Sequence, residues 1–268
     1  MYLSNIYTYP IKSTSPIAIT TGYLFSTGVA YDRHWMLVDE NNTMLTARKN
    51  PKLLHIKTQF DGANLVVKLP FRDFLLPLKP EPQKQILVDH WGDTPFSAWP
   101  QNDALDAALS EYLQFPCRLV YSASLAQEPL IERVSFADAQ PLLLTTSASL
   151  TELNQRLDSS NSPTGPSNSI GMERFRTNLV VHNAVADIED NWHRIRIGAC
   201  ELEVTAPCER CILTTIDPGT LERHPSQEPL RTLGKYRRLE GAGVGFGINL
   251  KVISGGIISV NDRVQVLS

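Results

Sequence analysis

The 268-residue sequence lacks any long apolar segment and any excess of positive charge. No stretch approaches the roughly 18 consecutive apolar residues of a membrane-spanning helix, so we expect no membrane association. The N-terminus, MYLSNIYTYPIKS, has no basic segment followed by an apolar run, which predicts no signal peptide and a cytoplasmic location. Lys and Arg number 25 against 28 Asp and Glu, which argues against a general nucleic-acid-binding protein.

Cysteine is also scarce, with only four residues. Cys117 and Cys200 lie in apolar, strand-like runs, so we expect them to be buried and to act as small apolar side chains. Cys208 and Cys211 form a single C-x-x-C motif. So few cysteines in a chain expected in the cytoplasm argue against a disulfide framework.

A dinucleotide-binding fingerprint is missing as well. The glycine-rich stretch 241–247 (GAGVGFG) does not match G-x-G-x-x-G, and no strand–loop–helix context surrounds it. We expect this stretch to form a flexible turn or a place where backbones approach closely.

The remaining pattern predicts an α+β fold that is mainly β. Short apolar runs separated by turns, such as 36–38, 44–46, 55–60 and 64–69, are typical of an antiparallel barrel or sandwich, while prolines between 70 and 82 indicate a loop. Helices are expected over 102–114 and 147–157, and a Ser/Pro-rich loop over 158–168. Further strands are expected near 178–181, 192–197, 200–204, 249–253 and 264–267. We place a domain boundary near residue 120, giving domains 1–120 and 121–268.

The C-x-x-C motif in APCERCILTT (206–215) has four possible interpretations. Half of a zinc site would need a second Cys or His pair, which the sequence does not offer. A redox dithiol normally precedes a helix, whereas the β-branched run 212–216 favours a strand. A soft thiolate ligand to a transition metal, favoured electrostatically by Arg210, is a third possibility. Two inert thiols in a turn are the fourth.

Basic residues next to short motifs could form a phosphate clamp. Lys12 and Ser13 follow a proline turn in YPIKS, Arg33 precedes a strand-like run, and Arg176 precedes the apolar run of FRTNLVV. Arg binds phosphate through two parallel N–H groups and Lys binds it as a point charge, but the sequence alone does not show that these residues converge. Each of them is more commonly a solvated surface charge.

Six segments in order resemble the MOSC family over nearly the whole chain: YPIKS (9–13), YDRHWMLVDENNTMLTAR (31–48), SFADAQPLLLTTSASL (135–150), FRTNLVV (175–181), PCERCILTTIDP (207–218) and GFGINL (245–250). The chain is similar to the YcbX-type bacterial members and to the mitochondrial amidoxime-reducing component. The resemblance implies an N-terminal MOSC β-barrel region followed by a MOSC β-barrel domain with a few helices.

The resemblance also implies a bound molybdenum cofactor (molybdopterin). The family's metal-ligating and catalytic cysteine precedes I-L-T-T, which here is Cys211. The positions that match cofactor contacts of the family are Lys12, Ser13, Arg33, Asp138, Arg176, Asn178, Glu209, Arg210 and, at a more variable position, Asn249. Cys208 then has a supporting role or takes part directly in redox chemistry. Arg48 is expected to be an interface residue or a structural support, and His34 and His224 are weak candidates for acid–base roles.

The implied activity is reduction of N-hydroxylated compounds such as hydroxylaminopurines, amidoximes or hydroxylamines. Many YcbX-type members continue into an iron–sulfur domain, but no C-x4-C-x2-C pattern is present here. We therefore expect electrons from a separate flavoprotein or iron–sulfur reductase. Two alternatives remain. One is a carrier that delivers cofactor or sulfur without turnover, and the other is a non-molybdenum β-barrel binding protein with an incidental C-x-x-C motif. The sequence does not specify the physiological substrate or the oligomeric state.

Overall fold

The computed structural model describes residues 1–92, 95–126, 135–138, 140–159, 169–241 and 243–268. The chain forms two compact units: an N-terminal unit of Thr8–Ile17 and Tyr31–Asp138, and a C-terminal unit of Met1–Tyr7, Ala18–Ala30 and Ala139–Ser268. The units do not follow a single cut in the chain, because strands near the N-terminus pair with strands of the C-terminal half. The sequence domains 1–120 and 121–268 stay a prediction.

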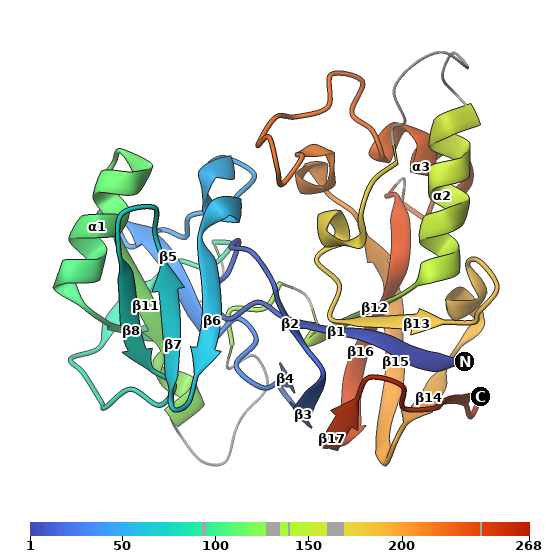
Figure 1. Ribbon diagram of the computed structural model, residues 1–268, viewed down its shortest axis with the longest axis horizontal. Helices are drawn as coiled ribbons and strands as arrows, with labels where there is room; N and C mark the ends of the chain where they lie inside the picture. Colours follow the sequence, from blue (N-terminus) through green and yellow to red (C-terminus); the bar gives the residue numbers. More distant parts are fainter. Residues whose placement is uncertain (93–94, 127–134, 139, 160–168, 242) are drawn as a thin grey trace. The chain divides into compact units, whose positions relative to one another are not determined.

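The C-terminal unit is built on an eight-stranded sheet in the order β18-β14-β15-β16-β12-β13-β1-β2 (Figure 1). β12 and β13 run parallel, whereas β15 pairs with β14 and β16 in antiparallel register. The strands are β1 (Tyr2–Thr8), β2 (Ile17–Ile19), β12 (Leu142–Thr146), β13 (Leu179–His182), β14 (Arg194–Ile197), β15 (Cys200–Glu209), β16 (Gly245–Ser254) and β18 (Val264–Val266).

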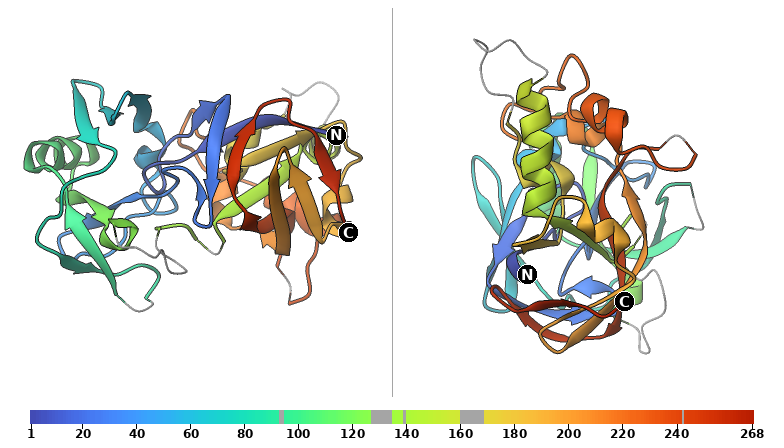
Figure 2. Two further views of the ribbon diagram at one scale, coloured as in Figure 1. Left: turned by 90° about the horizontal axis from the view of Figure 1, so that it is seen from below. Right: turned by 90° about the vertical axis from the view of Figure 1, so that its right-hand side faces the viewer.

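Alternation of side chains explains why these segments form strands. In β14 the two isoleucines, Ile195 and Ile197, are fully buried, while Arg194 and Arg196 between them face outward. The right-hand view of Figure 2 shows the strands of this unit curving around a common interior. That interior is filled by a large aliphatic cluster drawn from β1, β3 and β12–β18.

Smaller elements complete the C-terminal unit. They are the three-stranded sheet of β17 (Gly256–Ser259), β3 (Thr21–Phe25) and β4 (Gly28–Val29), the helices α2 (Ser147–Ser159) and α3 (Leu230–Tyr236), and the 3-10 turns η3 (Met172–Phe175), η4 (Ile188–Asn191) and η5 (Ile212–Thr215). α2 confirms the helix expected over 147–157. The expected loop 158–168 lies largely outside the described residues.

The N-terminal unit contains two antiparallel sheets, ordered β5-β11-β10-β9 and β6-β7-β8. Its helix confirms the one expected over 102–114. The Asn102 side chain caps this helix by accepting the Leu105 N–H at 2.9 Å. The elements are β5 (Trp35–Asp39), η1 (Pro51–His55), β6 (Lys57–Asp61), β7 (Asn64–Lys68), β8 (Asp73–Pro77), β9 (Ile86–Val88), β10 (Phe96–Pro100), α1 (Asp103–Leu113), β11 (Cys117–Ser122) and η2 (Ala123–Ala126).

One expectation about loops is wrong and another is confirmed in part. The proline-rich stretch 70–82 contains strand β8, in which Phe74 and Leu76 are buried and Pro77 lies at the end of an edge strand, where its missing N–H is tolerated. The glycine-rich stretch forms the start of β16 and not only a turn. The expected close approach is confirmed at Gly247, because a Cβ there would lie 2.5 Å from the Leu144 carbonyl oxygen and φ is +76°.

The mainly β, α+β fold class is confirmed by these sheets. Cys117 in β11 and Cys200 in β15 are buried, as expected. Within the described residues, no helix has the length and apolar character needed to cross a membrane.

Candidate functional site

Cys211 lies where β15 ends and the turn η5 begins. β15 ends at Glu209, and Cys211 is the residue that precedes the first residue of η5, with extended backbone angles (φ −106°, ψ 175°). The strand expected over 212–216 is wrong, since residues Ile212–Thr215 form a single 3-10 turn.

Two threonine hydroxyls explain why a β-branched run forms this turn. Thr214 Oγ1 donates to the carbonyl of Cys211 at 3.0 Å, and Thr215 Oγ1 donates to the carbonyl of Ile212 at 2.7 Å. Each hydrogen bond reaches back three residues, so these side chains stabilise the turn from within the segment. A strand would instead need hydrogen bonds to a neighbouring strand. Both threonines are buried, whereas Cys211 is exposed.

The exposed thiol of Cys211 is suited to hold an added group. Its sulfur has no polar partner among the described residues, and none of the His, Cys, Asp and Glu side chains in those ranges form a cluster of three that could bind a metal alone. A metal bound here would take one thiolate from the protein and its other ligands from a cofactor. The donor set therefore fits the molybdenum cofactor that the resemblance implies, in which a dithiolene supplies further sulfur ligands.

The hydrogen bonds of Arg210 go to groups other than the Cys211 thiol. Its guanidinium donates to Cys208 Sγ at 2.9 Å and to the Phe175 carbonyl at 2.6 Å, and it lies 5.6 Å from the centre of the Phe175 ring. The side chain thus ties the end of β15 to η3 and orients the half-buried Cys208. Electrostatic support of the Cys211 thiolate by Arg210 stays a prediction.

The other residues of the C-terminal unit that are predicted to contact the cofactor differ in exposure and in position. Glu209 is exposed, and its carboxylate lies against Gly243. Arg176 ends η3 with φ of 53° and is half-buried. Asn249 is half-buried in β16, opposite Ala206 of β15.

Asn178 has a structural role in the sheet. It is 2% exposed, its Oδ1 accepts the Leu143 N–H at 3.2 Å, and its Nδ2 donates to the Tyr7 carbonyl at 3.2 Å. Since its amide links β1, β12 and β13, packing alone explains this residue. A cofactor contact by Asn178 stays a prediction.

Sequence reasoning missed Arg174, which connects η3 to the segment after η5. Its guanidinium donates to Asp217 Oδ2 at 2.7 Å. Burial raises the pKa of Asp217, but the N–H groups of Thr220 and Gly219, together with Arg174, lower that pKa below its usual value. Arg174 precedes Arg176 by two residues in MERFRTN, and nothing in the sequence distinguishes a structural arginine there from a ligand-binding one.

In the N-terminal unit, Lys12 and Asp138 lie together. Lys12 is 5% exposed, donates to the Phe136 carbonyl at 2.8 Å and forms an ion pair with Asp138, which is 68% exposed. The buried end of this pair is anchored by a carbonyl, whereas the carboxylate faces solvent. Ser13 follows with φ of 69° and is buried.

Arg33 belongs to the same network, because its carbonyl accepts the Phe136 N–H at 2.8 Å. Its guanidinium pairs with the buried Asp32 and lies 4.3 Å from the centre of the Tyr9 ring. Burial lowers the pKa of Arg33, but the charge of Asp32 outweighs this and the pKa is raised overall, so Arg33 is a permanent cation.

Both candidate histidines contribute to local structure, and an acid–base role for either stays a prediction. Burial lowers the pKa of His34 to about 3, so its ring is neutral near pH 7, and it packs against Tyr31, Trp35 and Tyr121. His224 accepts the N–H of Ser226 at 3.2 Å through Nδ1, which shapes a turn.

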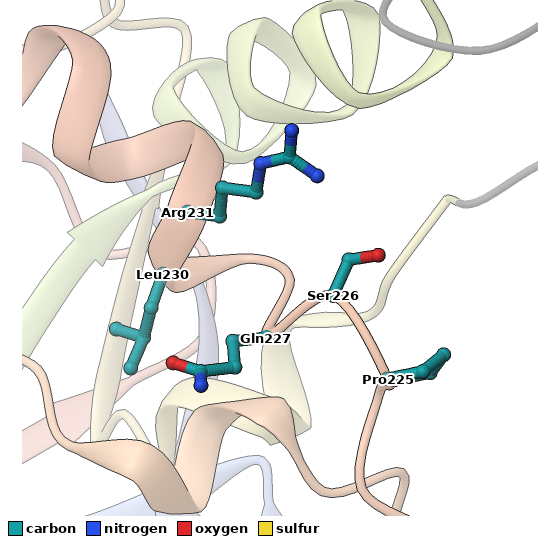
Figure 3. Close-up of a pocket in the computed structure, with 5 residues that line it drawn as sticks. All are labelled: Pro225, Ser226, Gln227, Leu230 and Arg231. Atoms are coloured by element: carbon teal, nitrogen blue, oxygen red, sulfur yellow. The ribbon is translucent and has the colours of Figure 1, made fainter.

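One pocket in the C-terminal unit lies beside α3, with a volume of about 420 Å³, lined by Pro225, Ser226, Gln227, Leu230 and Arg231 (Figure 3). The figure shows Arg231 and Gln227 pointing in different directions. Because the polar groups do not converge, the pocket does not define a ligand. Its segment is nevertheless joined to η5, since the His224 N–H donates to the Thr215 carbonyl at 2.8 Å.

Together, the fold and the thiol at η5 define a mainly β protein with a candidate cysteine ligand for a cofactor-borne metal. The chain belongs to the MOSC family: residues 132–265 match the MOSC domain and residues 1–116 match the MOSC N-terminal beta barrel domain.

Similar proteins include amidoxime-reducing components and a molybdenum cofactor sulfurase. The chain is 29% identical to mitochondrial amidoxime-reducing component 1 of Mus musculus, over 99% of this chain and 82% of that protein. It is 31% identical to the Danio rerio protein of the same name, over 88% and 74%. A molybdenum cofactor sulfurase of Oryza sativa subsp. japonica is 30% identical over 93% of this chain and 32% of its own length. The solved YUAD protein of Bacillus subtilis covers 98% of this chain and 93% of its own, with a TM-score of 0.44 and 11% identity.

Proposed function

We propose that this chain is a molybdenum-cofactor-dependent oxidoreductase that reduces N-hydroxylated compounds, among them hydroxylaminopurines, amidoximes and hydroxylamines. The observation that carries the proposal is the exposed Cys211 thiol, held at the start of η5 with no polar partner among the described residues. The names of the amidoxime-reducing relatives support the choice of substrate.

When bound, the cofactor would supply two-electron redox chemistry suited to removing the oxygen of an N–O group. Cys211 would hold its metal through the thiolate. The hydroxyls of Thr214 and Thr215 keep the turn rigid, so that the sulfur keeps one orientation during turnover. Arg210 joins this turn to Phe175 and thereby fixes its base.

Cationic side chains are proposed to bind the anionic parts of the cofactor. In the N-terminal unit these are Lys12 and Arg33, with Ser13 and Asp138 as further contacts; in the C-terminal unit they are Arg176 and Arg210, with Asn178, Glu209 and Asn249 as further contacts. The buried positions of Lys12 and Arg33 support this proposal, because a buried cation that is already oriented loses little side-chain entropy on binding an anion.

Electrons are proposed to come from a separate flavoprotein or iron–sulfur reductase. The test is to make the protein in a host that synthesises the cofactor and to measure molybdenum and oxidised pterin per chain. Reduction of a hydroxylamine is then followed with an artificial electron donor. Stoichiometric cofactor with turnover is expected, whereas cofactor-free protein from the same host would overturn the proposal.

A carrier of cofactor or sulfur is the second candidate. It is favoured by the similarity to molybdenum cofactor sulfurase and by Cys208, a second thiol three residues before Cys211. Mass spectrometry of the purified protein distinguishes the two functions. A persulfide on either cysteine, together with the absence of turnover, would favour the carrier.

A further inference from the structure

Arg174 joins η3 to the segment that follows the thiol turn, by which we mean Cys211 and η5. Its side chain is 9% exposed, and its guanidinium donates to Asp217 Oδ2 at 2.7 Å. Asp217 follows the last residue of η5 by two positions. An arginine at this depth needs an opposite charge, because an unpaired buried charge destabilises the fold strongly. The ion pair is therefore a fixed connection between two elements.

A second arginine joins the same elements in the opposite direction. Arg210, which directly precedes Cys211, donates to the carbonyl of Phe175 in η3 at 2.6 Å. The chain before the thiol turn thus gives an arginine to η3, and η3 gives Arg174 to the chain after the turn. Because one connection lies on each side of the thiol turn, the turn is held against η3 at both of its ends.

The carboxylate of Asp217 is oriented by its own loop. Its Oδ1 accepts the N–H groups of Gly219 at 2.7 Å and Thr220 at 3.0 Å. Its backbone N–H donates to the Glu222 carbonyl at 2.8 Å, which closes the loop after the thiol turn. Asp217 therefore shapes this loop through contacts that do not involve Arg174. The bond from Oδ2 to Arg174 adds only the connection to η3.

We propose that Arg174 is a positioning residue that fixes the Cys211 sulfur relative to Arg176, the residue that ends η3. The N–H of Arg176 donates to the Glu173 carbonyl at 3.2 Å, so its backbone moves with η3. The inference rests on the proposed function, in which Cys211 holds the metal and Arg176 contacts the cofactor. Two contacts to one ligand reinforce each other when their spacing is fixed, because the second contact then forms at a high effective concentration.

Spin labelling of the full chain without cofactor tests the positioning directly. In a Cys208→Ser background, a nitroxide is attached to Cys211, which is exposed, whereas Cys117 and Cys200 are buried. The mobility of the nitroxide is read from the line shape of its electron paramagnetic resonance spectrum. We expect Arg174→Met to make the nitroxide at least about twofold more mobile, because the thiol turn then keeps one of its two connections to η3.

Further variants separate the ion pair from side-chain bulk. Arg174→Lys should restore most of the immobilisation, because the bond to Asp217 uses one donor and one acceptor. Asp217→Asn keeps an oxygen for the N–H groups of its loop but removes the charge, and should mobilise the nitroxide as Arg174→Met does. Arg194→Met breaks an exposed pair with Glu203 and is the control without effect. Equal mobility in Arg174→Met and Arg174→Lys, or in Arg174→Met and the parent, would overturn the inference.

Cofactor retention links the position of the sulfur to binding. In protein from a cofactor-synthesising host, Arg174→Met should lose molybdenum and pterin at least about tenfold faster during dialysis than the parent. KM for a hydroxylamine should stay unchanged, since Arg174 is paired and only 9% exposed. A more mobile nitroxide with an unchanged rate of cofactor loss would refute the positioning role. If the parent itself takes up no molybdenum, the proposed function fails, while the nitroxide still decides whether Arg174 positions the thiol.

Discussion

Lys12 and Arg33 in the N-terminal unit are each enclosed by partners, whereas Cys211 in the C-terminal unit extends from a turn with its sulfur in solvent. Lys12 is held by a carbonyl and a carboxylate, and Arg33 by Asp32 and the ring of Tyr9. The difference shows two ways to prepare a ligand site. A buried charge must be held in one orientation by partners that also offset the free-energy cost of its burial. A thiolate ligand needs only a rigid backbone and a sulfur that the cofactor can reach.

The largest effect is expected at the thiol. Cys211→Ser should lower hydroxylamine reduction by more than about 100-fold, because even residues that merely orient a metal ligand typically contribute 10–100-fold. Stability to urea should change little, since the side chain is exposed. Cys208→Ser is the matched control and should retain activity within about tenfold. Full turnover of Cys211→Ser with molybdenum bound would contradict the assignment.

Removing the charged partner of an enclosed cation should lower the free energy of unfolding. Asp32→Asn leaves Arg33, whose side chain is 14% exposed, without its counter-charge, and should lower the free energy of unfolding by about 2–4 kcal/mol. Urea unfolding measures this. Glu152→Gln, which breaks the exposed Glu152–Arg156 pair, is the control and should cost less than about 0.5 kcal/mol. Similar losses of unfolding free energy in both variants would mean that the buried ion pair contributes no more to stability than the exposed one.

Removing the arginine beside the thiol turn should have a smaller effect. Arg210→Ala takes away the donor to the Phe175 carbonyl and to Cys208, and should destabilise the fold by about 1–2 kcal/mol. Arg231→Ala removes a guanidinium with no polar side-chain contact in the described parts of the chain and should be nearly neutral. If the two variants unfold at the same urea concentration, Arg210 does not hold the turn.

The smallest effect concerns Asp106, a half-buried carboxyl of the N-terminal unit that, unlike Asp32, forms no ion pair with any described residue. Burial raises the pKa of Asp106 to about 6, although the Leu119 N–H and Arg118 oppose the shift. The folded protein therefore binds this proton more tightly than the unfolded chain does, and the resulting stability is present below about pH 4 and lost as pH rises through 6.

Asp106→Asn should accordingly be more stable relative to the parent at pH 7.5 than at pH 4.5. The Asn oxygen can still accept the Leu119 N–H, which Asp106 accepts at 2.7 Å. Glu111→Gln on the exposed face of α1 serves as the control and should show a difference that does not vary with pH in this way. A constant difference for Asp106→Asn between the two pH values would contradict the raised pKa.

Predictions from local pattern were confirmed where local chemistry determines the structure. The helix capped by Asn102 and the buried Cys117 and Cys200 depend on periodicity and apolarity within a few residues. The strand expected over 212–216 was wrong because Thr214 and Thr215 use their hydroxyls to close a turn. β-branched residues favour strands only when no such internal partner is available.

Candidate site residues could be named from the sequence, but their hydrogen-bond and ion-pair partners could not. Arg210 stands next to Cys211 in the chain, yet its guanidinium binds Cys208 and Phe175, because side-chain direction depends on where η3 lies. Arg174 stands just before the FRTN segment, and only the fold reveals its ion pair with Asp217.

The sequence by itself determined the family, the mainly β fold class and the position of Cys211 in the chain. These can be recognised from short motifs and from the order in which they occur. The tertiary structure alone decided which charges are buried and paired, and that strands near the N-terminus join the C-terminal unit. The physical reason is that strand pairing and ion pairing join residues more than a hundred positions apart, such as Lys12 with Asp138, and no local propensity records such contacts.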